Sequence, residues 1–251
     1  MEKQMNYKII IQYDGSRYDG WQKQGNTSQT IQGKIEAVLC RYAGEEVEVH
    51  GAGRTDAGVH ALGQTANFHL AKEADAQELL EYLNRYLPED IEITELVRVP
   101  ERFHSRLNAA EKTYRYRVEA GSCKHVFERK QIYRMEDCRG TLDLEAMRRA
   151  ADLLEGTHDF KSFCANKRMK KSTVRTVKRI GITRRGTEYI FDYTGDGFLY
   201  NMVRILTGTL LEVGLGRRDW RSMEALLEAK DRSQAGFTAP AQGLTLLNVR
   251  Y

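Results

Sequence analysis

Residues 47–68 read VEVHGAGRTDAGVHALGQTANF. Two short strand-like runs, at 47–49 and 64–68, stand on either side of a glycine-rich turn. Runs of this kind, bounded by turn residues, are typical of strands. The segment therefore predicts two consecutive strands, near residues 46–51 and 63–70, joined by the turn.

The elements on both sides of this pair follow a β-α-β-β-α-β order. In the first half the pattern predicts strands at 7–13 and 91–99 and helices at 29–43 and 75–87. In the second half it predicts strands at 112–120, 174–185, 187–194 and 243–251, helices at 142–156 and 199–214, and an added helix at 220–229. This is the order of the ferredoxin-like split β-α-β unit. We expect an α/β protein of the α+β kind with two ferredoxin-like halves, 1–105 and 106–251, each an antiparallel sheet backed by helices.

The charge is unevenly distributed along the 251 residues, although the formal net charge is only +4. Residues 1–105 carry 11 basic and 17 acidic residues, and the remainder carries 28 and 18, a net charge of +10. Residues 161–185 hold ten basic residues and no acidic one. Such a run is either a solvated face or the contact surface for a polyanion such as RNA, and its extent favours the polyanion.

Several classes of site and of protein are disfavoured by the sequence. The four cysteines are widely spaced without a C-x-x-C pair, and the six histidines form no ligand-like pair, which argues against a disulfide scaffold and a zinc site. We therefore expect no metal and no cofactor, and thiols in a reducing compartment. No apolar run approaches the ~18–20 residues of a membrane helix, and the N-terminal residues lack the apolar core of a signal peptide. We expect a cytoplasmic protein without a membrane segment.

The turn itself does not match a phosphate-binding loop. The motif GAGRTD has Asp56 where the third glycine of a dinucleotide fingerprint belongs, and a strand follows it instead of a helix. Gly51, Gly53 and Gly58 permit unusual backbone torsions or the close approach of a bulky ligand, with the Asp56 carboxylate at the bottom of that approach. The alternative is an ordinary polar turn, in which aspartate and small residues are common.

The segment GRTDAGVHA at 53–61 resembles the catalytic motif of the TruA family of tRNA pseudouridine synthases. Further blocks resemble the family in the same order, namely YDGSRYDGWQ (13–22), FHSR (103–106), KTYRYR (112–117), DF-x-SF (159–163), GFLYNMVR (197–204) and GLTL (243–246). The resemblance implies the pseudouridine synthase fold and an isomerase that converts uridine to pseudouridine in the anticodon stem-loop of tRNA, at positions 38 to 40. It also implies a homodimer that acts on tRNA without a cofactor.

The resemblance carries roles onto four residues. It implies that Asp56 is the nucleophile, that Arg54 assists base flipping, that Tyr114 stacks on the target base and that Arg204 pairs with the catalytic aspartate. Each has a plainer interpretation: a polar turn for Asp56, a phosphate contact or surface charge for Arg54, core packing for Tyr114 and a solvent-facing charge for Arg204. Residues two apart in an extended segment share a face, so the side chains of Arg54 and Asp56 would both face the same ligand.

Other residues are assigned from their surroundings in the sequence. The candidates for contact with RNA phosphates are Lys167, Arg168, Lys170 and Lys171. Trp21 and Tyr18 fit either the core or an RNA-facing surface, and a lone histidine such as His60 is more typical of a structural role.

Two alternative functions are compatible with the sequence. A non-catalytic RNA-binding module or chaperone on the same scaffold would use the basic run and the aromatic residues, but it would have no use for Asp56, because a carboxylate repels phosphate. A family relative that modifies other uridines, for example in ribosomal RNA, would retain the same chemistry.

Overall fold

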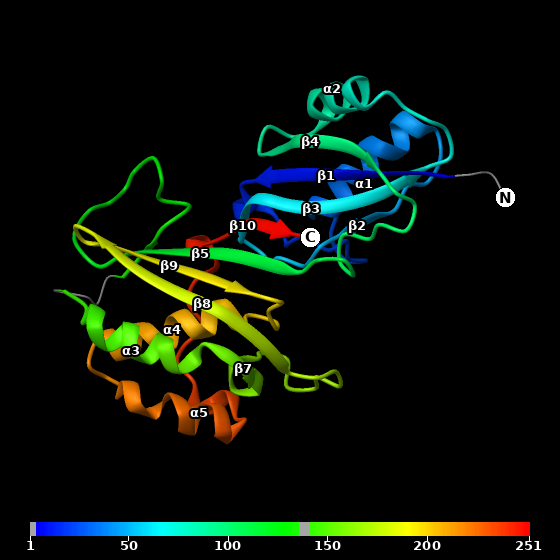
Figure 1. The fold of residues 1–251 in the computed structure, drawn as a ribbon. Helices are drawn as coiled ribbons and strands as arrows, with labels where there is room; N and C mark the ends of the chain where they lie inside the picture. Colours follow the sequence, from blue (N-terminus) through cyan, green and yellow to red (C-terminus); the bar gives the residue numbers. More distant parts are fainter. Residues whose placement is uncertain (1–3, 136–140) are drawn as a thin grey trace. The chain divides into compact units, whose positions relative to one another are not determined.

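The computed structural model describes residues 4–135 and 141–251, which divide into two compact units (Figure 1). Unit 1 comprises Met1–Ala110 and Leu246–Tyr251, and unit 2 comprises Glu111–Thr245. The last strand, β10 (Leu244–Arg250), therefore begins in unit 2 and ends in unit 1.

Unit 1 has the predicted β-α-β-β-α-β order. Its elements are β1 (Met5–Tyr13), α1 (Ile31–Ala43), β2 (Val49–Gly51), β3 (His60–Leu70), α2 (Ala76–Tyr86) and β4 (Ile91–Val99). Strand β1 lies between β3 and β4 and is antiparallel to both, while β2 pairs antiparallel with β3, with Val49 opposite Phe68. The predicted pair within residues 47–68 is confirmed, and the strand order is that of a ferredoxin-like sheet.

Unit 2 has the same order with additions. Its elements are β5 (Glu111–Glu119), β6 (Tyr133–Arg134), α3 (Leu144–Leu154), β7 (Gly156–Asp159), β8 (Val174–Arg185), β9 (Glu188–Gly195), α4 (Met202–Gly214) and α5 (Met223–Ala229). Strand β9 lies between β5 and β8, antiparallel to both, and the sequence analysis missed the short strands β6 and β7. Strand β7 consists of the residues GTHD, which carry no apolar alternation.

Local sequence signals explain where the helices begin and end. The Thr30 hydroxyl accepts a hydrogen bond from the Gly33 amide at the start of α1, and Gly44 ends that helix with a left-handed φ of 73°. Asp75 caps α2 by accepting from two backbone amides, and Asp143 caps α3. These caps satisfy amide groups that would otherwise lack partners at the helix N-termini.

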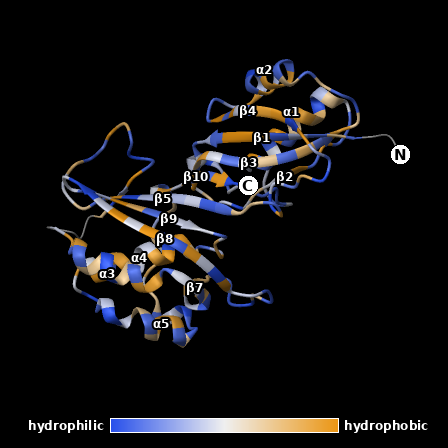
Figure 2. Ribbon diagram, viewed as in Figure 1, coloured by the Kyte–Doolittle hydropathy of each residue, from blue (hydrophilic) through white to orange (hydrophobic). Residues whose placement is uncertain are grey.

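Each unit has its own apolar core. In unit 1, Ile9 and Ile11 of β1 are fully buried, and the rings of Tyr7 and Phe68 stack 5.7 Å apart; Figure 2 shows hydrophobic residues along β1. In unit 2, Tyr116 and Phe191 are fully buried on paired strands. The fold class predicted from the sequence, α+β with two helix-backed antiparallel halves, is confirmed.

The described residues contain no helix that is both long and apolar enough to cross a membrane. Cys40, Cys123 and Cys164 are free thiols, and Cys138 lies outside the described residues.

Candidate active site

The glycine-rich turn, residues 52–59, joins β2 to β3 in unit 1 and is held by the segment that follows β1. The Trp21 amide donates to the Thr55 carbonyl at 3.0 Å, and the Gly58 amide donates to the Tyr18 carbonyl at 3.2 Å. Gly20 has a φ of +99°, and a Cβ there would lie 2.7 Å from the Thr55 carbonyl oxygen. Only glycine allows this close approach, so two of the sequence blocks, 13–22 and 53–61, form one structure.

The structure corrects one expectation about the turn glycines. The space beside Gly51 is filled by the Trp21 indole rather than left for a ligand, because a Cβ on Gly51 would lie 2.5 Å from Trp21 Nε1. Trp21 and Tyr18 are both buried, so the core interpretation holds for these two side chains. Gly58 has a φ of +78°, a left-handed conformation that favours glycine.

Asp56 and Arg54 flank a buried anchor. The Thr55 side chain is buried and its Oγ1 lies 2.8 Å from the Tyr13 hydroxyl. Asp56 is half-buried, its carbonyl accepts from the Val59 amide at 3.1 Å, and Arg54 is exposed. Because Thr55 is hydrogen-bonded to Tyr13 of β1, the backbone positions of Arg54 and Asp56 on either side of Thr55 are fixed.

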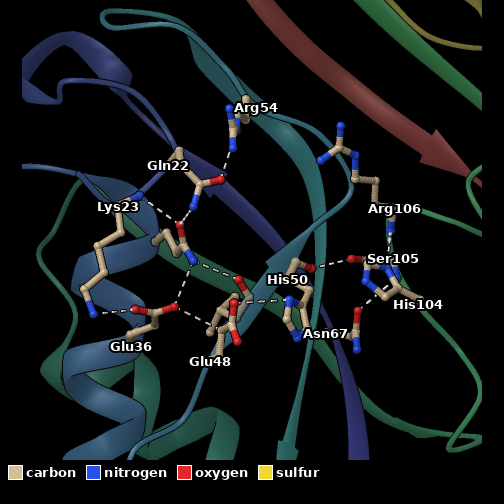
Figure 3. A network of polar contacts seen from close by, with 12 residues as sticks. Gln22, Lys23, Glu36, Glu48, His50, Arg54, Asn67, His104, Ser105 and Arg106 are labelled. Atoms are coloured by element: carbon tan, nitrogen blue, oxygen red, sulfur yellow. Dashed lines mark hydrogen bonds and ion pairs between the residues drawn. The ribbon is translucent and has the colours of Figure 1, made fainter. Parts of the chain in front are cut away.

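Arg54 has a partner that the sequence analysis missed. Its Nε donates to Oε1 of Gln22 at 3.0 Å, and Figure 3 shows the two side chains pointing toward each other. Gln22 ends the block YDGSRYDGWQ, but an uncharged glutamine carries no signal of its own. The resemblance to the family at this block was the only indication that it matters.

His60 has a structural role, as the sequence analysis expected. The imidazole is buried, and its Nδ1 accepts a hydrogen bond from the Gly15 amide at 3.1 Å. The same nitrogen lies 3.2 Å from the carboxylate of Asp14. These contacts join the end of β1 to the start of β3, and they give His60 an explanation without acid–base catalysis.

Tyr114 lies on β5 in unit 2 and is buried on the same side of the strand as Tyr116. Its ring meets that of Phe198 edge to face, with centroids 5.3 Å apart and an interplanar angle of 86°. The Tyr116 hydroxyl donates to the Pro240 carbonyl at 2.6 Å, and burial raises the Tyr116 pKa well above its usual value. Tyr116 is therefore a core residue, and Tyr114 is the member of the pair with an aromatic neighbour from another sequence block.

Arg204 lies in the first turn of α4 and is half-buried. Its Nε donates to the Ala239 carbonyl at 2.7 Å and its Nη1 to the Asn201 side-chain oxygen at 2.9 Å. Asn201 precedes the first residue of α4 with a left-handed φ of 60°, and its side chain makes no capping hydrogen bond. A guanidinium held in this way differs from a mobile charge on a solvent-facing stripe.

The candidate phosphate contacts of unit 2 are all exposed, and none of the four forms an ion pair with a described residue. Three of them, Lys167, Lys170 and Lys171, line a pocket of about 910 Å³ together with Lys161, Lys230 and Arg232. Two acidic residues, Asp159 and Asp231, also line the pocket. Burial raises the pKa of Asp159, but the Thr173 hydroxyl and Lys230 outweigh burial, so this pKa lies below its ordinary value. The excess of cations makes this pocket suitable for an anion.

One group within the described residues brings possible metal ligands together. Ligand atoms of Glu119, Cys123 and His125 all lie within 4.8 Å of one another. Glu119 and His125 already share a 2.6 Å hydrogen bond, and the Glu119 carboxylate also accepts from the Gly121 amide at 2.6 Å. The sequence analysis did not predict this cluster, and these hydrogen bonds link Glu119, at the end of β5, to the loop that follows it.

Comparison with known proteins agrees with this arrangement. A family model described as tRNA pseudouridine synthase matches residues 9–108 and 150–251, which is more than half of the chain. A protein named tRNA pseudouridine synthase A from Bacillus sp. (strain KSM-64) is 50% identical over 98% of this chain and 99% of its own length. Proteins named tRNA pseudouridine synthase A 2 from Bacillus cereus and from Clostridium tetani are 45% and 44% identical, each over 98% of this chain and over 99% and 98% of their own lengths.

The family model matches the turn that carries Asp56 and the helix that carries Arg204. The strand that carries Tyr114 lies between its two matched ranges, and it is covered by the longer alignments with the named relatives. The resemblance on which the sequence analysis relied is therefore confirmed over nearly the whole length. The chain belongs to the tRNA pseudouridine synthase family, a family of isomerases that act on uridine in RNA.

Proposed function

We propose that this chain converts uridine to pseudouridine in the anticodon stem-loop of tRNA, at positions 38 to 40, with Asp56 as the reacting carboxylate. The observation that carries the proposal is the turn itself. Asp56 follows Thr55, whose side chain is hydrogen-bonded to Tyr13 of β1. Gly20 has no side chain, which allows the backbone of the turn to pack closely against it. Relatives with the name tRNA pseudouridine synthase A support tRNA as the substrate.

The chemistry needs one carboxylate and no metal. The glycosidic bond to N1 of uracil breaks, the base rotates, and a bond forms between C5 of the base and the same sugar carbon. The hydrogen on C5 then leaves as a proton and N1 gains a proton, so the product is an isomer of the substrate. Uracil leaves as a stabilised anion, so no strong general acid is required. Asp56 either attacks the anomeric carbon or removes a proton from the sugar, and each route divides one difficult step into two.

Exclusion of water separates this reaction from hydrolysis. A glycosidase commonly uses two carboxylates, one of which activates water or forms the intermediate that water resolves. The turn at 52–59 offers Asp56 alone. A single carboxylate in a site without water would return the detached base to its sugar rather than release it.

The remaining roles in this proposal follow from the family. The target base must leave its stack before its glycosidic bond can be reached, and Arg54 assists that step. Tyr114 stacks on the base, and Arg204 stabilises the ionised form of the aspartate. Lys167, Arg168, Lys170 and Lys171 contact phosphates, and the enzyme acts as a homodimer.

The proposal is tested by mapping pseudouridine in unmodified tRNA transcripts after incubation with the purified protein. We expect new pseudouridines at positions 38 to 40 wherever a transcript carries uridine there. Ribosomal RNA fragments serve as the comparison substrate. Modification of ribosomal RNA with no change in tRNA would favour a relative with another target, and binding without any pseudouridine would favour the non-catalytic RNA-binding module.

A further inference from the structure

Arg54 is an exposed side chain that is nevertheless held in one direction. Its Nε donates to Oε1 of Gln22 at 3.0 Å (Figure 3). A long exposed arginine otherwise samples many rotamers, and fixing such a side chain costs conformational entropy. A residue that reaches into RNA gains if this ordering is complete before the RNA arrives.

Gln22 is itself oriented by a buried polar chain beneath it. Its Nε2 donates to Oε1 of Gln32 at 2.6 Å, and Gln32 is a buried residue of α1. The Gln32 Nε2 donates to the Glu36 carboxylate at 2.9 Å and to the Val49 carbonyl at 3.1 Å. Figure 3 shows the chain running from Arg54 down to Glu36.

The direction of every bond in this chain is set by the backbone. The Lys23 amide donates to Oε1 of Gln32 at 2.8 Å, and the Val49 carbonyl can only accept, so the Gln32 amide cannot be turned around. The side-chain oxygen of Gln32 therefore faces Gln22, and Gln22 must donate a hydrogen bond to it from its NH₂ group. Gln22 is left with its carbonyl oxygen facing Arg54, the one arrangement that accepts a bond from a guanidinium.

The lower part of the chain also has a structural task, which can be separated from Gln22. The Val49 amide donates to Glu36 at 3.0 Å and Lys23 Nζ lies 3.1 Å from the same carboxylate, so Gln32 and Glu36 join α1 to β2. Gln22 is not needed for that link. If Gln22 is lost, Oε1 of Gln32 still accepts from the Lys23 amide, and no buried acceptor is left without a partner.

We propose that Gln22 is a positioning residue that holds Arg54 in the orientation required for flipping a paired uridine. The inference rests on the proposed role of Arg54 in the reaction. The hydrogen bonds from Glu36 through Gln32 to Gln22 connect Arg54 to α1 and β2. They thereby fix the orientation of its exposed guanidinium. In this account Gln22 acts through Arg54 rather than directly on the base or the reacting carboxylate.

The test compares single-turnover rates on two tRNA transcripts, one with the target uridine paired and one with the opposing nucleotide changed so that the uridine is unpaired. The variants are Gln22→Leu, Arg54→Met, the double variant, and Gln24→Leu as a matched control. Gln24 is an exposed glutamine of the same segment whose NH₂ group donates to the Asp19 carbonyl at 3.0 Å, away from Arg54. We expect Gln22→Leu to slow the paired substrate about tenfold and the unpaired substrate much less.

Two further outcomes are specific to positioning. Gln22→Leu should cause no additional loss when Arg54 is already methionine, and its melting temperature should equal that of the Gln24→Leu control. A parental rate for Gln22→Leu beside a slow Arg54→Met variant would overturn the inference and leave the proposed function intact. Rate losses of Gln22→Leu and Arg54→Met that add up in the double variant would overturn the inference in favour of a structural role. An equal rate loss of Gln22→Leu on both transcripts, together with a lower melting temperature, would do the same. A parental rate for Arg54→Met on both transcripts would overturn the proposed role of Arg54 itself, and the positioning role with it.

Discussion

Gly51 and Trp21 are packed in direct contact, and a Cβ on Gly51 would lie 2.5 Å from Trp21 Nε1. The indole is almost fully buried, so it has no free direction in which to move. The contact joins the end of β2 to the segment that holds the candidate catalytic turn.

Substitution of Gly51 by alanine should therefore destabilise unit 1. Overpacking of this kind costs about 1–3 kcal/mol, and each kcal/mol lowers the melting temperature by roughly 2–4 °C in a chain of this size. Calorimetry or thermal circular dichroism would measure the change. Gly25→Ala is the control, because a Cβ there has no neighbour within 4 Å; equal melting temperatures for the two variants would show that the contact is not tight.

Much of the fold could be predicted from local patterns. The strands predicted at 91–99 and 174–185 have the bounds of β4 and β8 as the structure has them. The helix predicted at 29–43 begins two residues before α1 does, because Thr30 was not recognised as the residue that caps it. Elements without periodicity were missed, and β6, with two residues, is the clearest case.

The candidate site was only partly predictable, because its support comes from contacts between distant segments. Asp56 and Arg54 were found from one motif, whereas the 3.0 Å bond from Arg54 to Gln22 links residues 32 positions apart. The filling of the Gly51 space by Trp21 is another contact of this kind. Sequence periodicity reports which face of an element is buried, but it does not report which side chain of another element lies against it.

The hydrogen bond between the Glu119 carboxylate and His125 should make stability depend on pH. Burial raises the Glu119 pKa, but hydrogen bonds from His125, Thr187 and the Gly121 amide outweigh it, and the pKa lies below its ordinary value. A lowered folded-state pKa contributes stability above the unfolded value of about 4.3, and this stability is lost as the pH falls. Glu119→Gln should therefore cost about 1–3 kcal/mol in urea unfolding at pH 7 and less at pH 4. A difference that does not shrink on acidification would contradict the assignment.

The basic residues at 167–171 should contribute affinity for tRNA without base specificity. Replacing Lys167 and Lys170 with glutamine should flatten the dependence of log affinity on log salt by roughly one unit for each lost phosphate contact. Lys178→Gln is the control within the same basic run, because Lys178 Nζ is already paired with Glu111 at 2.9 Å. Filter binding across a salt series measures the slopes, and an unchanged slope for the double variant would mean that these lysines face solvent.

Arg204 and Arg54 should produce different kinetic defects. If Arg204 stabilises the ionised form of Asp56, as the family resemblance implies, Arg204→Met should move the acid limb of the rate–pH profile toward neutral pH. Arg54→Met should leave that limb in place and slow only the paired uridine. Single-turnover rates measured across the acid limb and up to neutral pH separate the two. An unchanged acid limb and rate for Arg204→Met would refute its role, and exchanged phenotypes would mean that the two roles are reversed.

The central claim is that Asp56 is the reacting carboxylate, and Asp56→Asn tests it most directly. The variant keeps the shape of the side chain and removes the charge that attacks the sugar or takes its proton. Pseudouridine formation in tRNA would be followed under single-turnover conditions, with tRNA affinity and melting temperature measured on the same preparation. The account predicts parental affinity, a parental melting temperature and no detectable pseudouridine. Appreciable turnover by the asparagine variant would contradict it.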